Sequence, residues 1–130
     1  MSHTPISDRE NQVARNIVDA ALKVHIALGP GLLESAYKAC LMQELSIRGL
    51  SVRSEVGVPV IYEGLKLNAG FRIDLLVDEC VVVEVKAIDA IHPVHVAQVL
   101  TYLKLSERRL GLLLNFNVAL MKEGIRRIAN

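Results

Sequence analysis

The sequence contains no tryptophan, two cysteines and only five aromatic residues, and its 15 basic side chains are nearly balanced by 14 acidic ones. Cys40 and Cys80 are too few for a disulfide framework and have no partner at the spacing of a zinc site. Both lie in apolar stretches, so we expect reduced core cysteines. The formal net charge of +1 excludes a strongly basic surface, so a polyanion must be held by a local patch or a metal ion.

Long hydrophobic runs are also missing. No segment has the uninterrupted apolar length of a membrane span, and the N-terminus lacks the apolar centre of a signal peptide, which predicts a cytoplasmic protein. A chain of 130 residues with 52% hydrophobic residues predicts one domain over residues 1–130, with residues 1–7 as a flexible tail. The mean hydropathy of +0.34 is high for so small a domain and is compatible with a homodimer interface.

Three segments carry apolar residues at helical spacing, and they predict helices over residues 8–28, 32–48 and 93–106. Gly29-Pro30-Gly31 ends the first, because proline cannot continue the hydrogen-bond ladder and glycine accepts the conformation of a C-cap. Pro93 suits the first turn of the third. The spacing places these residues on the buried side of the second helix: Leu33, Tyr37, Cys40, Leu41 and Leu45.

Strand-like runs occupy residues 52–61, 71–77, 81–86 and 110–116, and residues 124–128 predict a short last strand. Pro59 marks an edge strand or a bulge. The run from Val81 to Lys86 is nearly all β-branched, as expected for a central strand. The order ααβββαβ, with a short strand at the end, predicts an α/β fold in which helices flank one mixed β-sheet.

The central strand carries two charged residues, Glu84 and Lys86, that alternation places on the same face. Asp74 lies directly opposite Glu84 if residues 78–80 form a three-residue turn, whereas a two-residue turn sends the two carboxylates to opposite faces. Two adjacent carboxylates favour a divalent cation, and oxygen ligands alone select Mg²⁺ or Mn²⁺. An ion-pair cluster at a strand end explains the same spacing equally well.

Ile73-Asp74, followed by Glu84-Val85-Lys86, resembles the PD-(D/E)XK nuclease superfamily, with isoleucine in place of the proline. This implies a restriction-endonuclease-like core of order αβββαβ. Gly31-Leu32-Leu33-Glu34-Ser35-Ala36-Tyr37 resembles the signature of the GxxExxY protein family, a branch of that superfamily. Two further segments also match, since Gln98 to Tyr102 resembles the QxxxY motif and residues 111–116 resemble the final core strand. The resemblance covers roughly residues 29–116.

The resemblance implies a metal site. Asp74, Glu84 and the main-chain carbonyl of Val85 would bind Mg²⁺ or Mn²⁺, and Glu34 would approach from its helix to complete the site or to bind a second ion. A first-turn carboxylate is also favoured by the helix dipole alone, so Glu34 has a purely local alternative role. On spacing alone, Tyr37 is a core residue.

The resemblance also implies catalytic residues. Lys86 would orient or deprotonate the attacking water, and Gln98 and Tyr102, one helical turn apart, would position the water, the lysine or a phosphate. Both are equally compatible with the polar side of an amphipathic helix. His92 and His95 lack the spacing of a zinc helix, and we expect them to have loop and helix-start roles.

Two functions follow as hypotheses. The first is a Mg²⁺-dependent nuclease that hydrolyses phosphodiester bonds of nucleic acid, with DNA ahead of RNA as substrate. The second is a nuclease-like module without catalysis that binds nucleic acid or another protein. The near-neutral charge and the five aromatic residues favour the second, because they leave little to grip or stack a strand.

Overall fold

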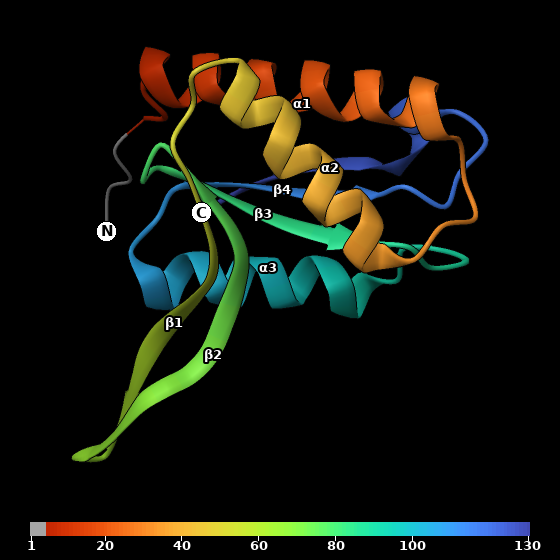
Figure 1. Ribbon diagram of the computed structural model, residues 1–130. Helices are drawn as coiled ribbons and strands as arrows, with labels where there is room; N and C mark the ends of the chain where they lie inside the picture. The colour runs from red at the N-terminus through yellow and green to blue at the C-terminus, as the bar shows by residue number, and fades with distance from the viewer. Residues whose placement is uncertain (1–4) are drawn as a thin grey trace.

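The computed structural model describes residues 5–130 (Figure 1). Its elements, in chain order, are α1 (Asp8–Leu28), α2 (Glu34–Ile47), β1 (Val52–Tyr62), β2 (Leu65–Val77), β3 (Val81–Lys86), α3 (Pro93–Ser106), β4 (Leu110–Asn115), a short 3-10 helix η1 (Met121–Gly124) and β5 (Ile125–Ala129). The strands form one mixed sheet in the order β1-β2-β3-β4-β5, with only β3 and β4 parallel. The predicted α/β fold is therefore confirmed.

The sheet lies between two helical layers, with α1 and α2 on one face and α3 on the other (Figure 1). The side chains of β3 alternate between them, since Val81, Val83 and Val85 pack in the core beneath α1 and α2. Val82 packs in the smaller core beneath α3. By the same alternation, Glu84 and Lys86 face the α3 side of the sheet.

Local signals set the helix ends. Ser7 accepts a hydrogen bond from the Glu10 amide, and the Glu10 side chain accepts one from the Ser7 amide, so a capping box starts α1. Of the tail predicted to be flexible, residues 1–4 lie outside the described part. Pro93 starts α3, as predicted, but α2 begins at Glu34 rather than near Leu32.

The strand predictions are confirmed for β3, and the register shift between Val58 and Val60 confirms the bulge expected at Pro59. The hairpin of β1 and β2 is longer than predicted, because β2 begins at Leu65 rather than Phe71. Figure 1 shows this hairpin projecting away from the body of the molecule.

The predicted buried side of α2 is only partly right. Tyr37, Leu41 and Leu45 are fully buried, but Leu33 precedes the helix and is 76% exposed. Cys40 is also exposed and Cys80 is half-buried, so the placement of Cys40 in the core was wrong, although both cysteines are free. No helix among residues 5–130 combines the length and apolarity needed to cross a membrane.

Candidate functional site

A three-residue turn sets the register between β2 and β3. Val77 pairs with Val81 and Leu75 with Val83, so residues 78–80 form the turn that the site prediction required. Asp78 and Glu79 both adopt positive φ angles, +49° and +57°, which close the turn. The register continues to Asp74 opposite Glu84, and this places both carboxylates at the point where the two strands stop pairing.

Asp74 and Glu84 hold the separating strands together with their side chains. The amide of Asp74 donates to Oε2 of Glu84 at 2.9 Å, and the amide of Val85 donates to Oδ2 of Asp74 at 3.0 Å. These two bonds take the place of ladder bonds between the backbones. The structure therefore brings Asp74 and Glu84 together, as the sequence predicted.

Glu84 is the most perturbed of the acidic groups. Its side chain is only 4% exposed, and burial raises its pKa to about 7, with the charge of Asp74 adding to the shift. The hydrogen bond from the Asp74 amide and the charge of Lys86 act in the opposite direction, and Glu34 raises the pKa slightly further. A buried carboxylate that resists ionisation is stabilised by a cation placed beside it.

Lys86 ends β3 on the same face as Glu84 and is half-buried. The chain beyond it is fixed by Asn115, which is 1% exposed at the end of β4. Its Oδ1 accepts from the amides of Ile88 at 3.1 Å and Asn117 at 3.2 Å, and its Nδ2 donates to the Ile88 carbonyl at 3.0 Å. The amide of Phe116 also donates to the Lys86 carbonyl at 2.9 Å. The backbone at and after Lys86 is therefore held by the C-terminal end of β4.

Glu34 lies exposed at the first turn of α2, and the loop before it is fixed by Tyr37. The Tyr37 hydroxyl donates to the Gly29 carbonyl at 2.5 Å and accepts from the Leu32 amide at 3.0 Å. Its ring is fully buried and stacks on Phe116, with ring centroids 4.7 Å apart. The tyrosine of the Gly31–Tyr37 motif is thus a core residue that orients the loop leading to Glu34.

Gln98 and Tyr102 lie half-buried on α3, near the paired carboxylates. Burial raises the pKa of Tyr102, and the charges of Glu84 and Asp74 raise it further, whereas the neighbouring Gln98 side chain acts in the opposite direction. The ring of Tyr102 stacks on Phe71 of β2, with centroids 4.2 Å apart. The stack joins α3 to the strand that carries Asp74.

The donor set fits a hard divalent cation. Each carboxylate uses one oxygen in the bonds described above, which leaves Oδ1 of Asp74 and Oε1 of Glu84 without a hydrogen bond among the described residues. Because the Lys86 carbonyl faces β4, alternation turns the Val85 carbonyl towards β2. Oxygen ligands of this kind suit Mg²⁺ or Mn²⁺. Within residues 5–130, no three His, Cys, Asp or Glu side chains gather as a cation cluster, so Glu34 stands apart from the pair.

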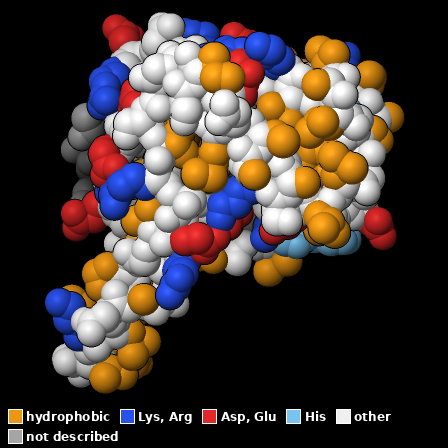
Figure 2. All heavy atoms as spheres, viewed as in Figure 1, with side chains coloured by type: hydrophobic (Ala, Val, Ile, Leu, Met, Phe, Trp, Pro, Cys, Tyr) orange, Lys and Arg blue, Asp and Glu red, His pale blue; other side chains and the backbone are white. Residues whose placement is uncertain are grey.

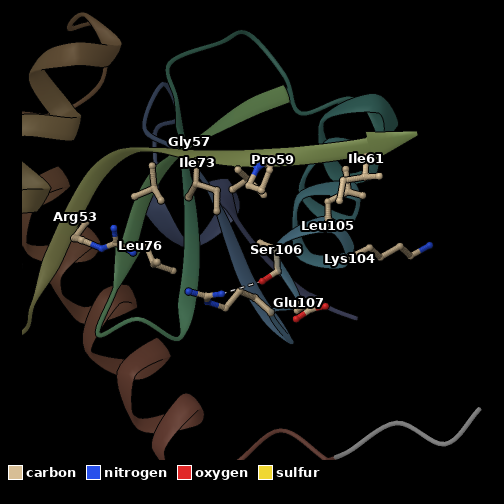
Figure 3. A pocket seen from close by; sticks show the side chains of 13 residues that line it. Arg53, Gly57, Pro59, Ile61, Ile73, Leu76, Lys104, Leu105, Ser106 and Glu107 are labelled. Atoms are coloured by element: carbon tan, nitrogen blue, oxygen red, sulfur yellow. Dashed lines mark hydrogen bonds between the residues drawn. The ribbon is translucent and has the colours of Figure 1, made fainter. Parts of the chain in front are cut away.

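A cleft of about 640 Å³ lies between β1 and the C-terminal end of α3 (Figure 3). Its basic lining residues are Arg53, Lys104 and Arg108, and Ile73, the neighbour of Asp74, forms part of its wall. Asp74, Glu84 and Lys86 do not line it. On the face shown in Figure 2, acidic and basic side chains meet at the base of the protruding hairpin.

Two features of the site were missed in the sequence. The first is the Asn115 clamp, since no local signal ties Asn115 to Ile88. The second is an ion pair between Lys38 of α2 and Glu55 of β1, which lowers the pKa of Glu55. Lys38 follows Glu34 by one helical turn, so the spacing in the sequence pointed to Glu34 rather than to Glu55, which is 17 residues away. His92 and His95 form the helix-start structure expected of them, with the His92 amide donating to Nδ1 of His95 at 2.9 Å.

Comparison with known protein families places the fold and the site in a wider context. A family model described as the PD-(D/E)XK nuclease superfamily matches residues 11–128. No curated protein and no solved structure gives a significant match. The matched range includes β1 to β4, all of β5 but its last residue, α2, α3 and most of α1, and with them every residue of the candidate site.

Proposed function

The chain belongs to the PD-(D/E)XK nuclease superfamily, and from that premise we propose that it is a metal-dependent nuclease that hydrolyses phosphodiester bonds. The observation that carries the proposal is the pairing of Asp74 and Glu84 across two separating strands, with Lys86 on the same face as Glu84. The Gly31–Tyr37 segment supports membership of the GxxExxY branch. We also propose that residues 1–130 act as one domain in the cytoplasm, with DNA ahead of RNA as substrate.

We propose that Asp74, Glu84 and the carbonyl of Val85 hold Mg²⁺ or Mn²⁺. A bound cation of this kind lowers the pKa of a coordinated water and neutralises charge on a phosphate. Burial raises the pKa of Glu84 and the neighbouring charge of Asp74 raises it further, so a cation beside the pair would favour the charged carboxylate. Glu34 completes the site by a movement at the first turn of α2.

Lys86 is proposed to orient the attacking water or remove its proton, and its ammonium group offsets the charge that develops on the phosphate oxygens. The Asn115 clamp holds the backbone that carries it. Gln98 and Tyr102 are proposed to position the water, the lysine or a phosphate from α3. The stack of Tyr102 on Phe71 supports this role, because Phe71 lies in β2, the strand that carries Asp74.

The test uses the purified chain with single-stranded DNA, duplex DNA and RNA, each with Mg²⁺ or Mn²⁺. We expect cleavage by the wild type and a loss of about a hundredfold or more in Lys86→Ala. Lys122→Ala is the matched control, because Lys122 is an exposed lysine of η1 outside the candidate site, and it is expected to cleave at the wild-type rate. Cleavage that is equal in wild type and Lys86→Ala would come from a contaminant and count against the proposal.

A second candidate function is a nuclease-like module that binds nucleic acid or protein without catalysis. It is favoured by the use of aromatic rings inside the fold, since Tyr37 stacks on Phe116 and Phe71 on Tyr102. Tyr62 is the remaining aromatic residue, 71% exposed, so few rings are left to stack on bases. Calorimetry separates the two candidates: Mn²⁺ binding that disappears in Asp74→Asn supports the nuclease, and retained partner binding without any metal response supports the module.

A further inference from the structure

Three polar side chains follow one flank of α3: His95, Gln98 and Tyr102. At about 100° per helical residue they lie within about 60° of one another, and all three are half-buried. The ring of Tyr102 stacks on Phe71 of β2, so this flank faces the strand that carries Asp74. Gln98 and Tyr102 belong to the proposed site, whereas His95 has no role in it.

The packing of α3 on β4 gives the position of His95 along the sheet. Val99 lies so close to Gly111 of β4 that a Cβ atom at that glycine would be 2.9 Å from Cγ1 of Val99. Gly111 pairs with Val82 of β3, and Glu84 is two residues further along that strand, which is roughly 6.6 Å. Because α3 runs in the opposite direction to β3 (Figure 1), the same distance takes about four residues back along the helix, at about 1.5 Å per residue. His95 precedes Val99 by four residues and is therefore level with Glu84.

The imidazole of His95 is held by the start of its own helix. The His92 amide donates to Nδ1 of His95 at 2.9 Å. A nitrogen that accepts this bond carries no proton, so the proton of the neutral ring is on Nε2. Nε2 forms no hydrogen bond within residues 5–130. It therefore offers a donor, and not the lone pair that a metal ion needs.

We propose that Nε2 of His95 donates a hydrogen bond to a phosphate oxygen of the nucleic acid held at Asp74 and Glu84, an inference that rests on the proposed function. A phosphate oxygen carries negative charge, and hydrogen bonds to such acceptors are stronger than those between neutral groups. A neutral imidazole also adds no positive charge beside a divalent cation, as a lysine or arginine at this position would. His95 positions the strand, while the cation and Lys86 act on the phosphate that reacts.

Two substitutions separate the two nitrogens of the ring. In His95→Asn, Oδ1 takes the place of Nδ1 and can still accept from the His92 amide, but the Nε2 donor is lost. In His95→Gln, the side-chain amide reaches the position of Nε2 and can still donate, but the His92 amide loses its acceptor. His92→Asn is the matched control, because His92 is an exposed neighbour whose backbone amide is unchanged by the substitution.

Fluorescence anisotropy measures the binding of labelled single-stranded DNA, duplex DNA and RNA in the presence of Mn²⁺. Every protein carries Lys86→Ala, so that the strand stays intact, and Lys86→Ala alone is the parent. We expect His95→Asn to weaken binding by about tenfold or more, and His95→Gln and His92→Asn to stay within about threefold of the parent. Urea unfolding should show the opposite order, with His95→Gln less stable than His95→Asn, because only glutamine removes the acceptor at the helix start.

Isothermal calorimetry with Mn²⁺ alone adds a second readout. His95→Asn should bind the ion as the parent does, because the Nε2 proton keeps His95 from acting as a ligand. A loss of Mn²⁺ affinity as large as that in Asp74→Asn would make His95 a ligand and overturn the proposal.

Nucleic-acid binding by His95→Asn that equals that of the parent would also overturn it, and so would equal weakening in His92→Asn. A loss in His95→Gln that matches or exceeds the loss in His95→Asn would show that the Nε2 donor is not the group that binds. A parent that binds none of the three nucleic acids would overturn the proposal as well.

None of these measurements uses cleavage, so the inference and the proposed reaction can fail separately. If the wild type cleaves but His95→Asn binds like the parent, only the inference fails. If the variants bind as expected but the wild type does not cleave, only the reaction fails.

Discussion

The backbone amide of Asp74 donates to the carboxylate of Glu84 at 2.9 Å, so the two candidate metal ligands are bonded to each other across the strands that carry them. The Asp74 carboxylate in turn accepts from the amide that follows Glu84. Each acid therefore has two roles, one in holding β2 against β3 and one in offering an oxygen to a cation. Substitutions at either position need to preserve the first role to test the second.

Asp74→Asn meets that requirement, because the amide oxygen of asparagine can still accept from Val85 while the negative charge is lost. We expect Mn²⁺ affinity to fall by about tenfold or more, since the ion loses one of its two charged ligands. Isothermal calorimetry measures the affinity, and circular dichroism checks the fold. Asp19→Asn, at an exposed position of α1, is the control and should bind as the wild type does. Equal affinities in both variants would remove Asp74 from the metal site.

The pKa of Glu84 predicts how stability depends on pH in metal-free buffer. Because folding raises this pKa from 4.5 to about 7, the folded state binds a proton at Glu84 more tightly than the unfolded state does. The resulting contribution to the free energy of unfolding is fully present below pH 4.5. It is lost as the pH rises towards and through 7. The full effect is about 3 kcal/mol in the free energy of unfolding.

Urea unfolding of wild type and Glu84→Gln measures this effect, because glutamine cannot titrate. The stability of the wild type relative to the variant should fall between pH 4.5 and pH 8. A relative stability that stays constant or rises over this range contradicts the assignment. Mn²⁺ binding should show the opposite trend and weaken below pH 7, where the proton competes with the ion for Glu84.

Tyr37→Phe removes the hydroxyl that joins Gly29 to Leu32. We expect a loss of about 1–3 kcal/mol in the free energy of unfolding, because two backbone groups lose their partner while the ring stack is kept. Chemical denaturation measures it. Tyr62→Phe is the matched control, since the Tyr62 side chain is 71% exposed, and it should change stability little. Equal stability of the two variants would show that the hydroxyl does not hold the loop.

Asn115→Ala removes the clamp behind Lys86. The amides of Ile88 and Asn117 then lose their partner, while the carbonyl of Ile88 keeps the Asn117 side chain as a donor, and we expect a cost of about 2–4 kcal/mol in the free energy of unfolding. Cleavage by the folded variant should also fall, because the segment that follows Lys86 is released. Asn68→Ala, at an exposed position of β2, serves as control. Unchanged stability in Asn115→Ala would contradict the role given to the clamp.

The sequence predicted the helix ends well where local chemistry sets them, as at Gly29 and Pro93, but it placed Ser7 in the tail rather than in the capping box of α1. It missed the first part of β2, because Asn68, Ala69 and Gly70 have low strand propensity and become extended only by pairing with β1. The buried side of α2 was only partly right, since periodicity gives the direction of a stripe but not how far the neighbouring elements cover it.

For the site, strand alternation and the length of one turn were enough to bring Asp74, Glu84 and Lys86 together. The Asn115 clamp was beyond sequence reasoning, because it joins a side chain to irregular backbone 27 residues away. The separation of Glu34 from the carboxylate pair was equally unpredictable, since it depends on the angle at which α2 begins. Both features depend on how the elements pack in three dimensions, which the spacing of residues in the sequence does not determine.

The turn at residues 78–80 lies on the surface, where changes of length are normally harmless. Here an odd number of added or deleted residues would exchange the two faces of one strand relative to the other, and Asp74 would point into the core beneath α1 and α2. An even number would keep the faces matched and shift the acids along the strands. The tolerance of this protein to length changes should therefore depend on whether the number is odd or even, at a position that touches no reacting group.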